Sequence, residues 1–364
     1  MTNFKSRLLD LYEKNETKVD VAFFLGGFAF DVFTLSDIDD PLNILQQVVY
    51  LLIIGSILFY DFLGSQDLYK PSPRIEKLWN YRQLIVHFLL GSLLSVYSLF
   101  FFKSASIFSS IIFIALMAGI MIANELKNVQ KSEVNLKIAL FVICLFSFFS
   151  MLIPVLLGFV GLVPFTLSII ATGLVLAGIV KLLKKKIQDS RLLLKSVAAP
   201  GGIVLVLFFL FYLVGWIPPV PLSVQTMGIY HSIEKSEGKY ILSHERPGWK
   251  FWHKGDQDFY AEPGDKINFF AEIFSPARFD DSVILHWFYN DPRQGWKSTD
   301  KIPMRITGGR KTGYRGFSTK ANYTEGEWRI SVETTDGREI GRIYFDVYKV
   351  AEPNPNRTFE QDIH

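Results

Sequence analysis

The sequence of 364 residues is poor in cysteine, and the only one, Cys144, lies in an apolar run. An intrachain disulfide is therefore excluded, as are metal sites built from pairs of cysteines. The formal net charge is only +3 and the charges are scattered, so the composition does not indicate a nucleic-acid-binding protein. Charges also run through the first 20 residues, where a secretory signal would have its apolar core, and we predict no such signal there.

Sequence motifs for catalysis are also missing. The chain contains no G-x-S-x-G nucleophile elbow, and no cysteine follows Cys144. The neighbouring acids Asp280 and Asp281 would point to opposite faces of a strand, and the stretch SPARFDDS also resembles a loop. We therefore expect no catalytic residue, no metal site and no cofactor.

Four histidines of the second half leave one enzymatic alternative open. No two of them have the i, i+4 or H-x-H spacing that places metal ligands on one face. A zinc enzyme would require three of the four to converge in the folded protein. These histidines are His231, His244, His253 and His286.

Long apolar runs are abundant in the first half and do not occur after Trp216. Each run approaches the length of about 20 residues that a helix needs to cross a bilayer. A shorter run at 21–35 contains Asp31 and would be a seventh, less regular span. We predict about seven spanning helices within a transmembrane domain at 21–217. The six longer candidates lie at 42–63, 82–102, 105–124, 136–156, 160–181 and 200–217.

Basic residues occupy every second connection between these runs, which predicts the orientation of the chain. Lysines and arginines are concentrated in segment 1–20 and in the loops near residues 70–82, 127–137 and 184–195, whereas the intervening loops hold one basic residue. Because basic loops stay in the cytoplasm, we predict a cytoplasmic N-terminal segment and place everything after Trp216 on the outer side.

Two ionisable residues within the runs, Asp31 and His87, are candidate intramembrane polar sites, since charged groups in spans are often functional. His87 follows Arg82 by five residues, which places it about 7.5 Å along the helix and near an interface. We expect a packed helical anchor. A transporter or intramembrane enzyme, regulated by the outer domain, remains the alternative.

The second half shows the period-two alternation of half-buried strands. In KINFFAEIFS the residues Ile267, Phe269, Ala271 and Ile273 share one face, and Asp336–Gly337 predicts a tight hairpin with a positive φ. Further short strands are expected at YILSHE, KFWHK, IPMRITG and YRGFST. The pattern predicts an antiparallel, immunoglobulin-like β-sandwich. We place a stiff proline-rich linker at 218–227, the sandwich at 228–350 and a disordered tail at 351–364.

Several motifs of this half carry a family resemblance. GWIPPVPLS, GIYH, AEPGD, HWFY, YRGFSTK, GEWRISVETTDG and REIGRIYFDV occur in this order between residues 215 and 349. Together they resemble the family known as domain of unknown function 2914. The resemblance implies a bacterial membrane protein with an extracytoplasmic β domain, and hence an inner-membrane protein with a periplasmic domain. The family implies no activity and no catalytic residues.

Two groups of side chains in the β domain are candidate binding residues. Trp249 and Trp252 lie in the turn-rich stretch RPGWKFWHKGD, whereas we expect Trp287 and Trp328 in the core. Basic residues on or near a rigid strand suit carboxylate or phosphate groups, although salt bridges to nearby acids are an alternative. The sequence thus predicts a non-catalytic recognition module for an envelope protein, a lipid headgroup or a glycan. The basic candidates are Arg310, Arg315 and Lys320.

Overall fold

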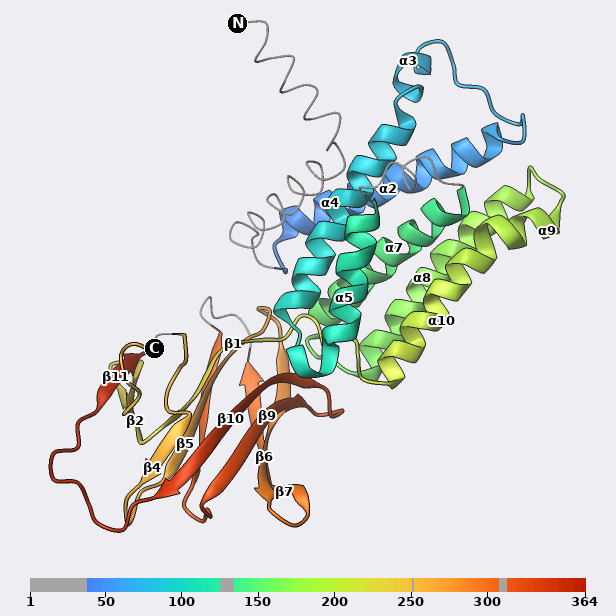
Figure 1. Ribbon diagram of the computed structural model, residues 1–364. Helices are drawn as coiled ribbons and strands as arrows, with labels where there is room; N and C mark the ends of the chain where they lie inside the picture. Colours follow the sequence, from blue (N-terminus) through green and yellow to red (C-terminus); the bar gives the residue numbers. More distant parts are fainter. Residues whose placement is uncertain (1–37, 125–133, 251, 308–312) are drawn as a thin grey trace, which may run out of the picture. The chain divides into compact units, whose positions relative to one another are not determined.

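The computed structural model describes residues 38–124, 134–250, 252–307 and 313–364 (Figure 1). The chain divides into two compact units. The first holds the apolar helices. The second holds the strands, together with the connections 103–110 and 154–162.

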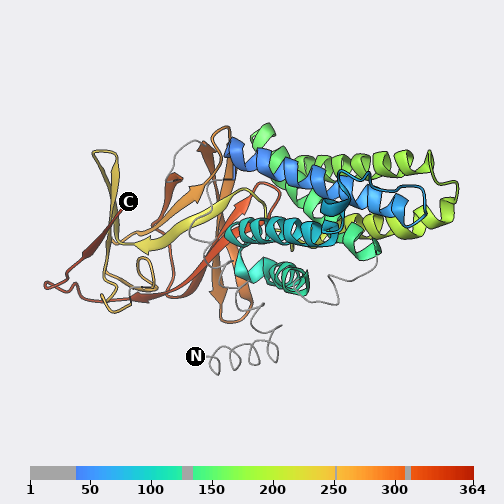
Figure 2. The same ribbon diagram turned by 90° about the horizontal axis from the view of Figure 1, so that it is seen from above.

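The helical unit is formed by long helices that run roughly alongside one another (Figures 1 and 2). Among the described residues, five helical stretches are long and apolar enough to cross a membrane, and a shorter one, 108–123, lies within α5. The predicted span 21–35, with Asp31, lies outside the described residues, so seven spans are not confirmed. The helices are α2 (Pro41–Gly64), α3 (Glu76–Trp79), α4 (Arg82–Lys103), α5 (Ile107–Asn124), α7 (Val134–Leu157), α8 (Leu162–Lys184), α9 (Ser190–Leu193) and α10 (Ala199–Leu213).

The last spanning stretch begins earlier than predicted. Helix α9, the π-helical turn η1 (Leu194–Ala198) and α10 form one apolar stretch over Ser190–Leu213, whereas the sequence predicted a span at 200–217. The side chain of Asp189 caps its start and accepts hydrogen bonds from the backbone N–H groups of Arg191 (2.8 Å) and Leu192 (3.1 Å). Arg191 and Lys195, which the sequence prediction placed in a loop, therefore lie at the start of this helical stretch.

Small residues allow close helix packing in this unit. A Cβ placed on Gly201 of α10 would lie 2.6 Å from a side-chain atom of Leu176 in α8. Helices α4 and α7 are the most covered, with 61% of their apolar windows buried, compared with 22% for α2 and 28% for α8. Helices α2 and α8 thus leave most of their apolar surface uncovered within the unit.

The second unit is a β-sandwich of two facing sheets with a third sheet of shorter strands. The facing sheets have the strand orders β1-β5-β8 and β4-β10-β9-β6-β7, and the third has the order β11-β3-β2. All pairings are antiparallel except that of β10 with β4. The strands are β1 (Ser223–Tyr230), β2 (Ser232–Ser236), β3 (Lys239–His244), β4 (Asp258–Ala261), β5 (Ile267–Phe274), β6 (Asp280–Asp291), β7 (Gly295–Thr307), β8 (Tyr314–Lys320), β9 (Gly326–Thr334), β10 (Glu339–Lys349) and β11 (Glu360–Ile363).

The core lies between the two facing sheets and contains both tryptophans that the sequence assigned to it. Trp287 is fully buried and Trp328 nearly so. Strand β5 is buried on both faces, because Phe270 on its second face packs with Tyr230 and Leu242 under the third sheet. Because both faces of β5 are buried, apolar residues occur on both of them. The alternation of apolar and polar residues in KINFFAEIFS is therefore weak.

The predicted hairpin at Asp336–Gly337 joins β9 to β10. Thr334 and Arg338 close it with a backbone N–H to carbonyl hydrogen bond of 2.8 Å, and Gly337 has a φ of +83°. A glycine fits here because other residues rarely adopt this conformation.

Three sequence predictions in the β unit are corrected. Strand β1 begins at Ser223, inside the predicted linker, because its backbone pairs with β5 from Ser223↔Phe274 onward. The expected strand KFWHK is not formed at Trp252 and His253, which lie in a turn. The tail is not disordered throughout: β11 pairs with β3, whose edge would otherwise leave backbone groups unpaired.

Candidate ligand-binding site

The loop between β3 and β4 presents two tryptophans at the surface. Backbone hydrogen bonds from Lys250 N–H to the Pro247 carbonyl (2.9 Å) and from His253 N–H to the Lys250 carbonyl (3.1 Å) fold it into two successive turns. These turns leave Trp249 65% and Trp252 57% exposed. The ring centroids lie 5.7 Å apart at an interplanar angle of 65°. Each ring therefore supports the other while keeping apolar surface in water.

A cleft of about 190 Å³, lined mainly by residues with polar side chains from this loop and from β4, lies beside the tryptophans. Lys250 connects the two features, since its Nζ lies 5.6 Å from the Trp249 ring centroid and 3.0 Å from Oδ2 of Asp258. The cleft is smaller than the roughly 300–1,000 Å³ of pockets that enclose drug-sized molecules, so it suits one ring-sized group. Its lining residues are Glu245, Arg246, Pro247, Lys250, His253, Gly255, Asp256, Gln257, Asp258 and Tyr260.

Gly255 lets the backbone of the cleft approach strand β1 closely. We call Gly255 and Asp256 the floor of the cleft. It has a φ of +63°, and a Cβ at this position would lie 2.2 Å from the carbonyl oxygen of Ile229 in β1. The approach lets the Asp256 N–H donate to the same carbonyl at 2.8 Å. Only glycine can occupy this position without moving the two segments apart.

Asp256 is a buried carboxyl that fixes the backbone on the opposite side of the cleft. Its two oxygens accept the N–H of Glu245 at 2.9 and 3.1 Å. Burial raises the pKa of Asp256 to about 7, although the hydrogen bond from Glu245 opposes this shift. The protonated form is therefore much easier to retain here than in water.

His231 lies beneath this floor and stacks on Phe259, with ring centroids 4.0 Å apart. Its Nε2 lies 3.3 Å from Glu245 and 3.5 Å from Asp256. Burial, together with the charge of Arg357, lowers the pKa of His231 to about 4. The imidazole is consequently neutral near pH 7 and acts as part of the packed support.

Arg357 in the tail neutralises the acidic groups around His231. Its guanidinium donates to Glu245 (2.7 Å), to Asp265 (2.8 Å) and to the backbone carbonyl of Tyr260 (2.7 Å). Burial lowers the pKa of Arg357, but the hydrogen bonds to Glu245 and Asp265 outweigh it and raise the pKa overall. Because Lys250 also pairs with Asp258, the cleft offers polar groups whose charges are largely compensated.

A second aromatic surface borders the cleft. Tyr260, which lines it, stacks on Tyr348 of β10 with centroids 5.3 Å apart and an interplanar angle of 24°. Both rings are exposed, by 50% and 41%. Aromatic faces are thus available on the Trp249–Trp252 loop and at the cleft wall.

The predicted basic residues Arg315 and Lys320 lie elsewhere, on β8, and not in the tryptophan loop. The Nε of Arg315 lies 3.3 Å from Oε1 of Glu272. The Lys320 side chain is only 6% exposed and pairs with Asp300, and its Nζ lies within 6 Å of the Trp287 and Trp328 ring centroids. Arg310 lies outside the described residues. The five predicted binding residues therefore do not form one described site.

The histidines and acids of the β unit do not form a described metal site. Among the described residues, no group of three or more histidine, cysteine or acidic side chains is placed to hold a metal ion. His286 contacts Glu333 and Ser298, and His244 lies near Asp362. Asp280 and Asp281 begin β6, where Asp280 pairs with Arg305.

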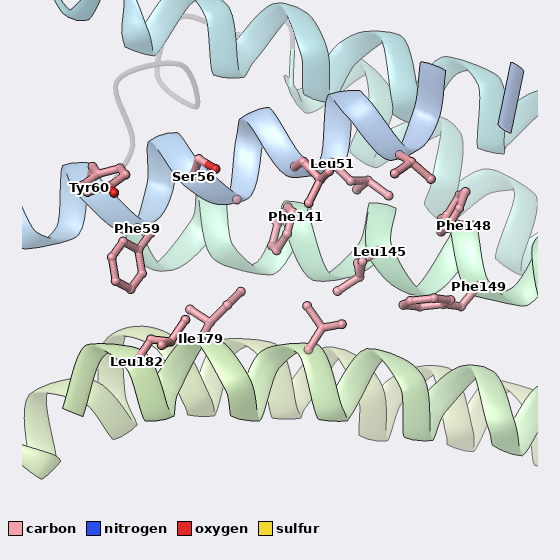
Figure 3. Close-up of a pocket in the computed structure, with 14 residues that line it drawn as sticks. Leu51, Ser56, Phe59, Tyr60, Phe141, Leu145, Phe148, Phe149, Ile179 and Leu182 are labelled. Atoms are coloured by element: carbon pink, nitrogen blue, oxygen red, sulfur yellow. The ribbon is translucent and has the colours of Figure 1, made fainter. Parts of the chain in front are cut away.

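The helical unit contains an apolar cavity of about 510 Å³ between α2, α7 and α8 (Figure 3). Predicted residue His87 is half-buried on α4 and does not line this cavity. Asp31 is outside the described residues. A polar cavity linking Asp31 to His87, which would favour a transporter or intramembrane enzyme, therefore stays a prediction.

Sequence reasoning missed several residues of the site. Gly255 and Asp256 stand in HKGD, where a Gly-Asp pair indicates a turn but not a buried carboxyl. Arg357 lies in a tail without periodicity. Only the pairing of segments distant in the sequence reveals their roles.

Comparisons with known proteins agree with the family resemblance. The model of the family described as "Protein of unknown function (DUF2914)" matches residues 280–347, which extend from β6 into β10. No curated protein matches the chain significantly. The family resemblance inferred from the motifs is thus confirmed for this part of the β unit.

Several solved structures are also similar to the chain. An immunoglobulin-like protein (PA1606) from Pseudomonas aeruginosa has 15% identity over 35% of this chain and 98% of its own, with a TM-score of 0.22. A beta-glucosidase from Listeria innocua has 7% identity over 38% of this chain and 18% of its own, with a TM-score of 0.21. The alkylpurine DNA glycosylase AlkC from Pseudomonas fluorescens has 11% identity over 86% of this chain and 100% of its own, with a TM-score of 0.23. Similarities of this size support no argument about activity.

Proposed function

We propose that this chain is a bacterial inner-membrane protein whose periplasmic, immunoglobulin-like β-sandwich is a non-catalytic recognition module for a neutral glycan. The observation that carries the proposal is the exposed Trp249–Trp252 pair beside a small cleft whose charges are compensated. The membrane location is supported by the apolar helices, and the orientation by the alternation of basic loops.

A sugar fits this arrangement for two reasons. The apolar C–H face of a pyranose ring can stack on an exposed indole, while its hydroxyls need nearby donors and acceptors. The cleft supplies these through the side-chain amide of Gln257 and the polar groups of Lys250 and Asp258. Its volume of about 190 Å³ matches one ring-sized group better than an extended ligand.

The other partner classes fit less well. An anionic lipid headgroup needs unpaired cationic groups, whereas Lys250 is paired with Asp258 and Arg357 with Glu245 and Asp265. A stable protein interface buries about 1,200–2,000 Å² in total, far more than two tryptophans and this cleft offer. A protein partner therefore fits this site less well than a sugar does.

The test is glycan binding by the full chain in detergent micelles. Titration with N-acetylglucosamine tetramer and with maltoheptaose, followed by tryptophan fluorescence and calorimetry, should show saturable binding of at least one. The double variant Trp249→Ala/Trp252→Ala should weaken it by about 5- to 150-fold, since each aromatic contact contributes about 0.5–1.5 kcal/mol.

The matched control is Trp296→Ala, which removes a partly exposed tryptophan on β7 outside the cleft. It should leave the affinity unchanged. Equal binding by the double variant and this control would contradict the proposed site. Absence of binding to either oligosaccharide at millimolar concentration would contradict the glycan assignment.

A further inference from the structure

The apolar cavity of the helical unit has the form of an elongated groove along α2. Its lining residues come from α2, α7 and α8, and Figure 3 shows Phe59, Phe141 and Leu182 among the side chains that surround it. Gly55 and Ser56 give α2 small side chains near its middle. The lining set is Val48, Leu51, Leu52, Gly55, Ser56, Phe59, Tyr60, Phe141, Leu145, Phe148, Phe149, Val175, Ile179 and Leu182.

The length of the groove matches one hydrocarbon chain. From Val48 to Tyr60 the α2 lining extends over roughly 18 Å at 1.5 Å per residue. One leaflet contributes about half of a hydrocarbon core of about 30 Å, or roughly 15 Å. A single acyl chain of one leaflet therefore fits along the groove, and its volume of about 510 Å³ lies within the range of ligand pockets.

One end of the groove carries a cluster of positive charge. On α8, Val175, Ile179 and Leu182 line the groove at intervals of four and three residues. Lys185 and Lys186 follow in the turn directly after α8, where the Lys185 N–H donates to the carbonyl of Leu182, a residue that lines the groove. These lysines are exposed, as are Lys181 and Lys184, and the described residues provide no ion-pair partner for them. Clustered lysines next to a spanning helix attract anionic lipid headgroups.

We propose that this groove binds an anionic phospholipid, with one acyl chain between α2 and α8 and the phosphate at Lys185 and Lys186. The apolar lining selects the chain and the lysines select the charge of the headgroup. The site goes beyond the glycan-binding function proposed for the β-sandwich, and it depends only on α2, α7 and α8 lying in a membrane.

The test is native mass spectrometry of the full chain, stripped of lipid and then titrated in micelles. Dioleoyl phosphatidylglycerol should bind at least tenfold more tightly than dioleoyl phosphatidylcholine. Filling the groove with Val175→Trp should reduce phosphatidylglycerol binding at least tenfold. The neighbouring variant Leu174→Trp is the matched control, because Leu174 is 67% exposed and does not line the groove.

The headgroup contact is tested separately. The double variant Lys185→Gln/Lys186→Gln should weaken phosphatidylglycerol binding about 30-fold and bring it close to that of phosphatidylcholine. Lys239→Gln/Lys266→Gln removes the same charge from exposed positions of the β unit and should have no effect.

Three results would overturn the proposal. The first is equal binding of the two lipids by the unaltered chain. The second is equal phosphatidylglycerol binding by Val175→Trp and Leu174→Trp. The third is a dimer in the unaltered chain that Val175→Trp converts to a monomer, because the groove would then be occupied by a second copy. None of these results depends on glycan binding.

Discussion

An exposed apolar side chain indicates lipid contact in the helical unit of this protein and a binding surface in the β unit. In the helical unit such residues are common, for example Phe88 at 68% and Leu174 at 67% exposure. There the exposed side chains belong to helices whose length and composition suit a bilayer, so lipid is their expected solvent. In the β unit the large apolar residues are mostly in the core, and the exposed tryptophans of one loop stand out. In water such a cluster indicates a binding surface.

The first prediction compares a core aromatic of one unit with an exposed aromatic of the other. Trp287→Ala should lower the free energy of unfolding of the β unit by about 3–5 kcal/mol, because it leaves a cavity between the two facing sheets. Phe88→Ala should change the stability of the helical unit by about 0.5 kcal/mol or less. Denaturation of the full chain in micelles, followed by near-ultraviolet circular dichroism, measures both. Similar effects would mean that Phe88 packs against protein and not lipid.

The second prediction concerns the pH dependence of the β unit. Burial raises the pKa of Asp256 to about 7, so its contribution to stability is lost as pH rises from about 4 to 7. Burial lowers the pKa of His231 to about 4, so its contribution is lost as pH falls from about 6.5 to 4. The two effects oppose each other in the natural chain.

Asp256→Asn separates them. The stability of this variant relative to the natural chain should increase with pH between 4 and 7, by up to about 4 kcal/mol. Urea unfolding at a series of pH values provides the measurement, with the exposed carboxyl variant Glu352→Gln as control. A constant difference across this range would show that Asp256 ionises as it does in water.

The third prediction tests how the tail is held. Arg357→Ala leaves Glu245 and Asp265 without their cation and should release the tail, lowering stability by about 2–3 kcal/mol. Hydrogen exchange should become at least tenfold faster at residues 360–364 and remain slow where β2 pairs with β3. The surface variant Arg293→Ala should change neither value. Persistent protection of β11 would show that strand pairing alone fixes the tail.

The sequence predicted the features that depend on local patterns. Apolar runs located the helices, period-two alternation located β5, and the Asp336–Gly337 pair located the hairpin between β9 and β10. The placement of Trp287 in the core was also correct. The sequence prediction failed where distant segments decide the structure. Ser223 belongs to a strand because β5 is available to pair with it, and Glu360–Ile363 form a strand because β3 has an open edge.

The candidate site was predictable only in part, for the same reason. Trp249 and Trp252 could be singled out because large apolar rings in a turn-rich stretch have no core to enter. The cleft beside them depends on Gly255 meeting Ile229 and on Arg357 returning from the tail. Lys320 illustrates the opposite error, since its charge suggested a surface site but its side chain is buried beside Asp300.

The most direct test of the proposed ligand site determines whether Trp249 and Trp252 are exposed to water or to lipid. The full chain is reconstituted in liposomes, and fluorescence quenching by aqueous acrylamide is compared with quenching by brominated phosphatidylcholine. The contribution of the pair is obtained by subtracting the signal of Trp249→Phe/Trp252→Phe. We predict that acrylamide quenches this contribution and brominated lipid does not. Quenching by brominated lipid would instead show that the tryptophans enter the bilayer, and it would contradict a ligand site on the β-sandwich.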